Sequence, residues 1–239
     1  LATALEQDVA DDADGTVAML LDLSRSEIEE SAYEMVMDGK LYIDSIDDRK
    51  VYMLENYYRA ERYVASKLYE LCNSTLNSLG LKADNLIKQE EKNSGIELSE
   101  KQKKAITTAV TVGVSAITGG PGTGKSTIIN TILHIFQSAG LSVLLAAPTG
   151  RAAKRMQQLC GNPASTIHRM LEYAYEENED KMFFGKNESC PLEADCIIID
   201  EFSMVDNSLF ASLLKASLFG LVKSANSPIP FFLSYIFNL

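Results

Sequence analysis

Nine consecutive residues near the middle of the chain have the composition and spacing of a phosphate-binding loop. Residues 119–127 read Gly-Gly-Pro-Gly-Thr-Gly-Lys-Ser-Thr, which fits the pattern GxxxxGK[ST]. Glycine lets backbone N–H groups turn toward a β-phosphate, Lys125 can reach the β- and γ-phosphate oxygens, and the Ser126 hydroxyl can bind Mg²⁺. The alternative is an ordinary glycine-rich surface turn. A strand-like run before the loop and a helix-like run after it favour the nucleotide site.

A pair of acids ends a second informative run. Residues 196–201 read Cys-Ile-Ile-Ile-Asp-Glu, which is typical of a strand buried on both faces of a parallel sheet. Asp200 can hold Mg²⁺ through water, and Glu201 can polarise an attacking water. The alternative for Asp200 is a structural cap on the next segment. Asp200 comes 75 positions after Lys125, which leaves room for elements that bring both to one sheet edge.

Charge is distributed unevenly along the chain. The net charge of the 239 residues is −11, yet residues 97–171 carry 8 bases and 2 acids. Residues 1–60 carry 15 acids and 5 bases, and residues 172–206 carry 11 acids and 2 bases. Electrostatic fields decay over about 8 to 10 Å at ordinary salt, so a local patch of positive charge is enough to bind a polyanion. Whole-chain charge therefore does not exclude a nucleic-acid partner.

Length and composition fit a piece of an enzyme rather than a whole one, because 239 residues support one or two domains and 46% hydrophobic residues can bury a sizeable core. The four cysteines lack paired CxxC spacing, which predicts reduced, mostly buried thiols rather than a metal site. Five acids near the N-terminus stand where a signal peptide needs bases and an apolar run. We expect a cytoplasmic location and no membrane association, since residues 224–228 interrupt the apolar C-terminal tail and leave only about a dozen apolar-rich residues where a membrane span needs about 20.

The first part of the chain predicts a small α+β module. Ser24 or Ser26 can cap a helix that ends at Gly39, and strand-like runs at 41–43 and 50–54 follow it. Helix followed by hairpin is typical of a winged-helix-like module. Its acidic character favours protein contact or packing over reading of a DNA groove.

Residues 57–79 have the apolar periodicity of an amphipathic helix. Its tyrosines could stack on bases, but packing is favoured for most of Tyr57, Tyr58, Tyr63 and Tyr69. Residues 80–97 are expected to be a domain junction. Ser99 then caps a helix, and strands at 114–118, 142–147 and 196–200 alternate with helices at 125–138 and 150–159. This order predicts an α/β fold, a P-loop NTPase parallel sheet with helices on both faces.

Four motifs in this order resemble RecD-like DNA helicases, superfamily 1 enzymes related to the exodeoxyribonuclease V alpha subunit. They are the phosphate loop, Ala-Pro-Thr-Gly-Arg-Ala-Ala-Lys-Arg-Met at 147–156, Ala-Ser-Thr-Ile-His-Arg-Met-Leu at 164–171 and Asp-Glu-Phe-Ser-Met at 200–204. The resemblance implies a winged-helix-like module at 1–55, a connecting helix and linker at 56–96, a RecA-like but incomplete first motor domain at 97–216, and a non-matching apolar tail at 217–239.

The resemblance also implies ATP and Mg²⁺ as cofactors and ATP-driven 5′ to 3′ movement along single-stranded DNA in recombination and repair. Gln102 would read adenine, because an amide offers a donor and an acceptor. Lys125, Asp200 and Glu201 would be catalytic, and Ser126 and Asp200 would hold the metal. The residues that bind the nucleotide would be Gln102, Gly119, Gly120, Pro121, Gly122, Thr123, Gly124, Lys125, Ser126 and Thr127.

The same resemblance places DNA contacts in the loops at the strand ends, where hydroxyl, backbone N–H and guanidinium groups can bind phosphates without reading sequence. The implied contacts are Pro148, Thr149, Arg151, Thr166 and His168. For His168 a purely structural histidine is the alternative, and Arg155 is expected on a solvated helix face. Single-stranded DNA is the expected partner, and the N-terminal module would meet duplex DNA ends or a protein.

Residues 217–239 depart from the family, with Lys223 as their single charged residue. We expect a truncated or frame-shifted end, or an incomplete gene model, and Leu1 in place of Met indicates a cut N-terminus. An exposed sheet edge would then favour aggregation. Because an arginine finger would come from a second motor domain, the fragment is expected to be inactive alone. The alternatives are a non-translocating P-loop NTPase switch and a catalytically silent protein-binding fragment.

Overall fold

The computed structural model describes residues 24–46, 49–73, 82–120, 122–176, 181–218 and 231–235. The chain divides into two compact units, one up to Tyr63 and one from Val64 onward. Helix α4 (Glu55–Cys72) crosses this boundary, so the first unit extends into the helix that was expected to connect the domains.

The N-terminal unit contains helix α3 (Arg25–Met37) followed by a hairpin of strands β1 (Leu41–Ile46) and β2 (Arg49–Leu54). A reciprocal capping box starts the helix, since Glu27 N–H donates to Ser24 Oγ at 3.3 Å and Ser24 N–H donates to Glu27 Oε2 at 2.7 Å. Helix and hairpin thus follow each other in the predicted order.

The tyrosines of this region divide into two groups. The rings of Tyr42 and Tyr58 stack with their centroids 4.4 Å apart, and the Arg62 guanidinium lies 5.5 Å from the Tyr58 centroid. Tyr63 is half-buried. Tyr57 and Tyr69 are 39% and 74% exposed, so the expected packing does not extend to them.

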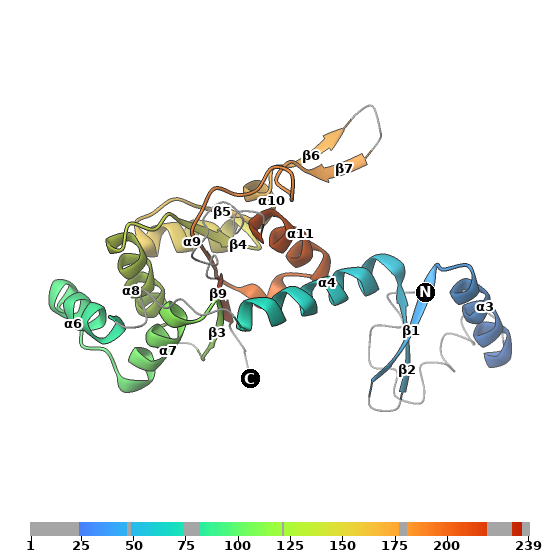
Figure 1. Ribbon diagram of the computed structural model, residues 1–239, viewed down its shortest axis with the longest axis horizontal. Helices are drawn as coiled ribbons and strands as arrows, with labels where there is room; N and C mark the ends of the chain where they lie inside the picture. The colour runs from blue at the N-terminus through green and yellow to red at the C-terminus, as the bar shows by residue number, and fades with distance from the viewer. Residues whose placement is uncertain are drawn as a thin grey trace. The chain divides into compact units, whose positions relative to one another are not determined.

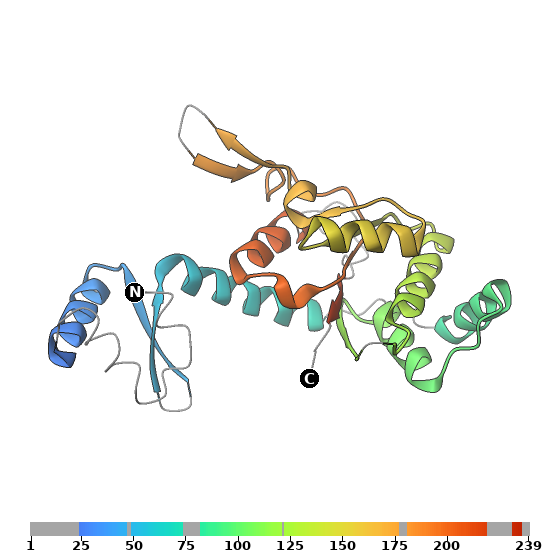
Figure 2. The same ribbon diagram turned by 180° about the vertical axis from the view of Figure 1, so that it is seen from behind.

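The second unit is built on a five-stranded sheet in the order β3-β9-β8-β4-β5, and all neighbouring strands are parallel. Helices α7 and α8 lie on one side of the sheet and α11 on the other (Figures 1 and 2). The predicted α/β fold is confirmed. The strands are β3 (Val114–Thr118), β4 (Val143–Ala147), β5 (Ala164–Thr166), β8 (Cys196–Ile199) and β9 (Phe231–Tyr235), and the helices include α7 (Glu100–Thr111), α8 (Lys125–Ser138), α9 (Gly150–Cys160) and α11 (Asn207–Leu218).

The continuous apolar run of β8 forms the centre of this unit, because all four of its residues are fully buried. A reciprocal polar clamp sets its register against β4. Asp195 Oδ2 accepts hydrogen bonds from Ser142 N–H at 2.8 Å and from Ser142 Oγ at 2.7 Å, and Asp195 N–H donates to Ser142 O at 2.9 Å. Since both residues directly precede their strands, Val143 pairs with Cys196 and the carboxyl ends of the two strands are aligned.

Helix α6 (Ala83–Ser94) occupies the segment that was expected to be a junction, and that prediction is wrong. Ala83 and Ile87, one helical turn apart, are 3% and 2% exposed and belong to the same core cluster as Ile106 and Ile129. Gly95 ends the helix in the left-handed conformation with φ 68°. The polar composition concealed a helix because few of its positions reach the core.

Strand β9 lies in the tail that matches no family motif. It pairs with β3 on one side and with β8 on the other, so Leu233 stands level with Ala116 and with Ile199. The exposed sheet edge that was expected from the missing family strands therefore does not lie between β3 and β8, because β9 fills that position. Aromatic and aliphatic residues have high strand propensity, which explains how a segment without a family motif can pair here. Residues 219–230 and 236–239 lie outside the described part.

A hairpin separates the motifs of the second unit. Strands β6 (Tyr173–Glu176) and β7 (Lys181–Phe184) pair antiparallel after the short helix α10 (Ile167–Met170). Both views show this hairpin projecting away from the sheet (Figures 1 and 2). In the described parts of the chain, no helix combines the length and apolarity needed to cross a membrane.

Candidate functional site

The loop between β3 and α8 depends on glycine for its shape. Gly122 and Gly124 have φ values of 75° and 80°, a region that side chains other than glycine rarely adopt. A Cβ on Gly124 would also lie 2.3 Å from Gln102 Nε2. Thr123 Oγ1 donates to Gly120 O at 2.9 Å and closes the turn. Pro121 lies outside the described residues.

Helix α8 begins without a side-chain cap. Gly124 occupies the N-cap position and has no side-chain oxygen, whereas α7, α9 and α10 are capped by Ser99, Thr149 and Thr166. The first N–H groups of a helix have no partner within it and carry the positive end of its dipole. The N-terminus of α8 is therefore ready to bind an anion, which favours the phosphate loop over an ordinary surface turn.

Lys125 points back over this loop in the structure. Its Nζ donates to Gly119 O and, at 3.3 Å, to Gly120 O. Ser126 and Thr127, in the first turn of α8, are half-buried. The ammonium group thus lies where the oxygens of a bound phosphate would take over its contacts with the loop carbonyls.

Gln102 contacts the same loop from α7. Its Nε2 donates to Thr123 O at 3.3 Å, and its Oε1 accepts from Ser99 N–H at 2.9 Å. An amide oxygen can accept two hydrogen bonds and an amide nitrogen can donate two, so each atom keeps one position for a nucleobase.

Asp200 and Glu201 follow the end of β8. Asp200 N–H donates to Ala146 O at 3.0 Å, and Asp200 Oδ1 accepts from Glu201 N–H at 2.9 Å. Glu201 has φ 54° and ψ 38°, and it opens the 3₁₀ turn η1 (Phe202–Met204). The left-handed conformation costs a non-glycine residue about 1–2 kcal/mol, and such strain concentrates at functional sites.

Strand register places these acids at the same edge as the loop. Ala116 and Ile199 both pair with Leu233 of β9 and so stand level. Thr118 and Glu201 therefore each lie two residues further toward the carboxyl edge.

The Ser126 hydroxyl and the Asp200 carboxylate are hard oxygen donors, which suit Mg²⁺ when phosphate oxygens and waters complete its shell. Among the described residues, no cluster of three His, Cys, Asp or Glu side chains could hold a metal by itself. This donor set fits a metal that arrives with a nucleotide.

The second predicted set lies at the ends of β4 and β5. Ala147 pairs with Thr166, which brings the Pro148–Thr149 segment beside the start of α10. Thr149 Oγ1 accepts from Ala152 N–H and Thr166 Oγ1 from Arg169 N–H, each at 3.2 Å. The two threonine hydroxyls therefore cap helices and keep their O–H groups as donors, while Arg151 and His168 are exposed. Pro148 is half-buried, and Arg155 is exposed as expected.

An aromatic cluster at the base of the hairpin was missed from the sequence. The His168 ring lies 5.4 Å from that of Tyr173 and 6.2 Å from that of Phe184, and the Tyr173 and Phe184 centroids are 4.9 Å apart. His168 thus has structural contacts and remains exposed, so both of its alternative roles stay open. The aromatic residues at 173, 175, 183 and 184 were the available signal.

The four cysteines differ in burial. Cys160 and Cys196 are buried, whereas Cys72 and Cys190 are exposed, so the expected burial holds for half of them. Burial, together with the charge of Asp200, raises the pKa of the Cys160 thiol to about 11, and burial also raises the pKa of Cys196. Both buried thiols are protonated at neutral pH and are poor nucleophiles.

Comparisons with known proteins agree with this geometry. The AAA domain matches residues 102–221. The ATP-dependent RecD2 DNA helicase of Deinococcus radiodurans is 36% identical over 163 residues, which are 68% of this chain and 22% of that protein. The RecBCD enzyme subunit RecD of Haemophilus influenzae is 33% identical over 144 residues, 50% of this chain and 22% of that protein.

A phage protein shows the same similarity over a shorter stretch. The ATP-dependent DNA helicase dda of Enterobacteria phage T4 is 39% identical over 102 residues, 41% of this chain and 23% of that protein. The matched part of this chain thus spans less than a quarter of the length of each of these three relatives. The phosphate loop, the acid pair and the match to the AAA domain show that the chain belongs to the AAA-domain family, and its motor region is similar to the corresponding part of RecD-like helicases.

Proposed function

We propose that this chain is the ATP-binding motor portion of a DNA helicase that acts in recombination and repair and moves 5′ to 3′ along single-stranded DNA. The observation that carries the proposal is the uncapped N-terminus of α8, with Lys125 over the loop and Asp200 and Glu201 at the same sheet edge. An anion-binding helix end and two acids after a strand that ends at the same sheet edge are what phosphoryl transfer to water requires.

Each residue of this edge has a distinct role in the proposal. The N–H groups of residues 122–126 and the Lys125 ammonium bind the β- and γ-phosphates, and the Gln102 amide binds the adenine. Ser126 and Asp200 would hold Mg²⁺, which neutralises phosphate charge when bound. Glu201 orients a water and takes its proton, as its place after the metal-linked acid allows.

Single-stranded DNA would lie across the ends of β4 and β5. Arg151 provides an exposed guanidinium group, and the capping hydroxyls of Thr149 and Thr166 can still donate to phosphates. Residues 97–171 carry the positive charge that such a path needs. For the acidic N-terminal module we propose contact with a protein rather than with duplex DNA.

Binding by the 239-residue chain tests the proposal. We expect Mg-ATP to bind in calorimetry and a fluorescent oligothymidine to bind in anisotropy measurements, with affinity that falls as salt rises. Mg-ATP binding without any oligonucleotide binding would instead indicate a nucleotide-dependent switch. Binding of neither would indicate a catalytically silent protein-binding fragment.

The chain by itself is expected to hydrolyse ATP at most marginally and not to unwind DNA. In P-loop enzymes an arginine finger supplies about 10³ to 10⁵ of the rate, and the RecD-like resemblance places that group in a second motor domain. Turnover near 1 per second or faster, of the order of a competent enzyme, would contradict this expectation if Glu201→Gln abolished it.

A further inference from the structure

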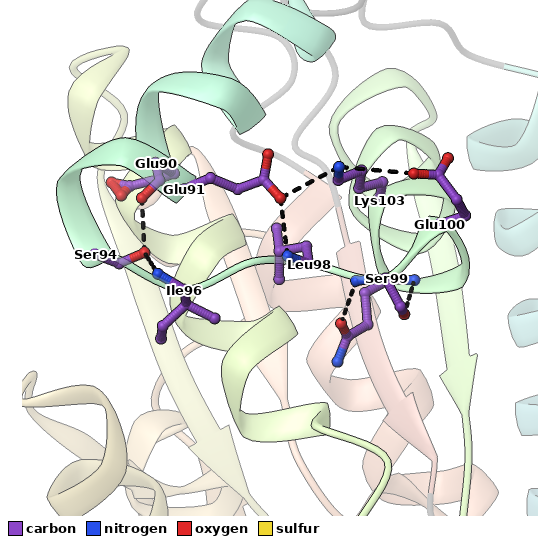
Figure 3. A network of polar contacts seen from close by, with 9 residues as sticks. Glu90, Glu91, Ser94, Ile96, Leu98, Ser99, Glu100 and Lys103 are labelled. Atoms are coloured by element: carbon purple, nitrogen blue, oxygen red, sulfur yellow. Dashed lines mark hydrogen bonds and ion pairs between the residues drawn. The ribbon is translucent and has the colours of Figure 1, made fainter.

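A chain of polar contacts connects α6 to the start of α7. Glu91 points from α6 toward Leu98 and Lys103 (Figure 3). Its Oε1 accepts from Leu98 N–H at 2.8 Å and lies 3.3 Å from Lys103 Nζ, and its side chain is 18% exposed. The hydrogen bond from Leu98 and the nearby Lys103 ammonium hold the pKa of the Glu91 carboxyl below its usual value, so the group is charged at neutral pH.

The segment between the two helices has a fixed path. Ser94 Oγ donates to Glu90 O at 2.7 Å and accepts from Ile96 N–H at 3.3 Å, and Gly95 turns in the left-handed conformation. The Leu98 side chain is 4% exposed and belongs to the core cluster. The position of Leu98 is therefore fixed twice: its side chain packs in the core, and its N–H donates to Glu91.

Ser99, the residue after Leu98, connects this fixed segment to Gln102. Ser99 N–H donates to Gln102 Oε1, and Gln102 Nε2 donates to Thr123 O in the phosphate loop. Because a backbone N–H can only donate, the amide oxygen must face Ser99 and the amide nitrogen must face the loop. The network thus fixes which atom of the amide is presented on each side.

We propose that Glu91 is a positioning residue for nucleobase selection, acting through Leu98 and Ser99 on the Gln102 amide. The inference rests on the proposed contact between Gln102 and adenine. Adenine presents an amino donor beside a ring-nitrogen acceptor, which matches the free positions of the amide. Guanine presents two acceptors on that edge and leaves the Gln102 oxygen without a donor. An amide held in place rejects guanine better than one that can rotate away.

Three ligands separate base selection from phosphate binding in the full chain. We would measure affinities for Mg-ATP, Mg-GTP and Mg-tripolyphosphate, which has no base. The variants are Glu91→Ala, Glu91→Gln, Lys103→Gln and Gln102→Glu. Glu91→Gln keeps an oxygen for Leu98 N–H and loses the ion pair, and Lys103→Gln also removes the ion pair. Gln102→Glu keeps the Ser-x-x-Glu capping box and loses the Nε2 donor.

In the parent chain we expect Mg-ATP to bind about tenfold more tightly than Mg-GTP. Glu91→Ala should lower this preference about two- to tenfold, because the amide loses its fixed orientation. Its tripolyphosphate affinity should stay within about twofold of the parent, since the phosphate contacts lie elsewhere. Glu91→Gln and Lys103→Gln should keep the preference, and Gln102→Glu should lose it without losing thermal stability.

A preserved ATP preference in folded Glu91→Ala would overturn the inference, as would an equal loss of tripolyphosphate affinity. If Glu91→Ala does not fold, Glu91→Asp keeps the charge and draws the carboxylate back by one methylene group. It should also lower the preference, and an unchanged preference there would equally overturn the inference. A parent chain that binds none of the three ligands would contradict the proposed function itself. Binding of ATP and GTP with equal affinity would contradict only the adenine contact and the role of Glu91.

Discussion

Helices α7, α8, α9 and α10 begin beside the residues proposed to bind nucleotide or DNA, and their N-termini are of two kinds. Helices α7, α9 and α10 each have a serine or threonine whose oxygen accepts a first-turn N–H, at Ser99, Thr149 and Thr166. Helix α8 has Gly124 at that position and no side-chain cap. A capped end is satisfied by its own residues, whereas an uncapped end keeps its donors for a ligand. The difference favours α8 over α7, α9 and α10 as the phosphate-binding end, and it gives Thr149 and Thr166 a structural role in addition to any DNA contact.

The largest effect should come from the lysine of the uncapped end. Lys125→Ala should weaken Mg-ATP binding by about 1.5–3 kcal/mol, because it removes a charge-assisted contact with the phosphates. Lys154→Ala, on the exposed face of capped α9, is the matched control and should leave affinity unchanged. Calorimetry measures both, and equal affinities for the parent and Lys125→Ala would contradict the phosphate site.

A smaller effect is expected from loss of a cap. Thr149→Val keeps the shape of the side chain and removes the oxygen that accepts Ala152 N–H, so it should lower the unfolding free energy by about 1 kcal/mol. Thr149→Ser retains the hydroxyl and should stay close to the parent. Urea denaturation compares the three chains. A destabilised Thr149→Ser would show that the methyl group, not the cap, stabilises this end.

Arg151 should affect DNA and leave the fold unchanged, because its side chain is exposed and Thr149 provides the cap. Arg151→Ala should weaken single-strand binding up to about fivefold, alike for all sequences, and should lower the slope of log affinity against log salt by about 0.7. Arg155→Ala, further along α9, is the control. Loss that depends on oligonucleotide sequence would point to base reading instead.

The smallest effect concerns two acids in the left-handed conformation. Glu172 has φ 55° and Glu201 has φ 54°. Replacement by glycine relieves strain but increases the freedom of the unfolded chain, so each change should stabilise the fold by at most ~1 kcal/mol. Thermal unfolding should show this for both. We expect Glu201→Gly alone to impair ATP hydrolysis in a complete enzyme, since Glu172 lies at the hairpin base, and equal impairment would contradict its special role.

Where one element is long and regular, the sequence predicted it well. The predicted runs 114–118 and 125–138 coincide with β3 and α8. Of the two candidate caps Ser24 and Ser26 the structure uses Ser24, and both it and the expected cap Ser99 form capping boxes. These signals are local, because apolar period and cap chemistry lie within a few residues. Helix α6 and strand β9 were missed, since only tertiary packing against α7 and α8, or pairing with β3 and β8, selects those structures.

The candidate site divides in the same way. Lys125, Asp200 and Glu201 stand in short motifs that any reader of the chain can find, and the strand register then places them at one edge. The contact of Gln102 with Thr123 spans 21 residues and was implied only by resemblance. Nothing local indicated that Glu91 orders the segment before Gln102, or that Glu201 adopts a left-handed conformation. Such features depend on how separate elements meet.

Hydrogen–deuterium exchange with and without Mg-ATP tests the contrast between the helix ends most directly. The N–H groups of residues 122–128 lie in the loop and the uncapped first turn of α8, so their exchange should slow when the nucleotide binds. Residues 150–155, in the capped first turns of α9, should exchange at the same rate in both conditions. Unchanged exchange in residues 122–128 at saturating Mg-ATP, or equal slowing in both peptides, would contradict the assignment of the phosphate site to α8.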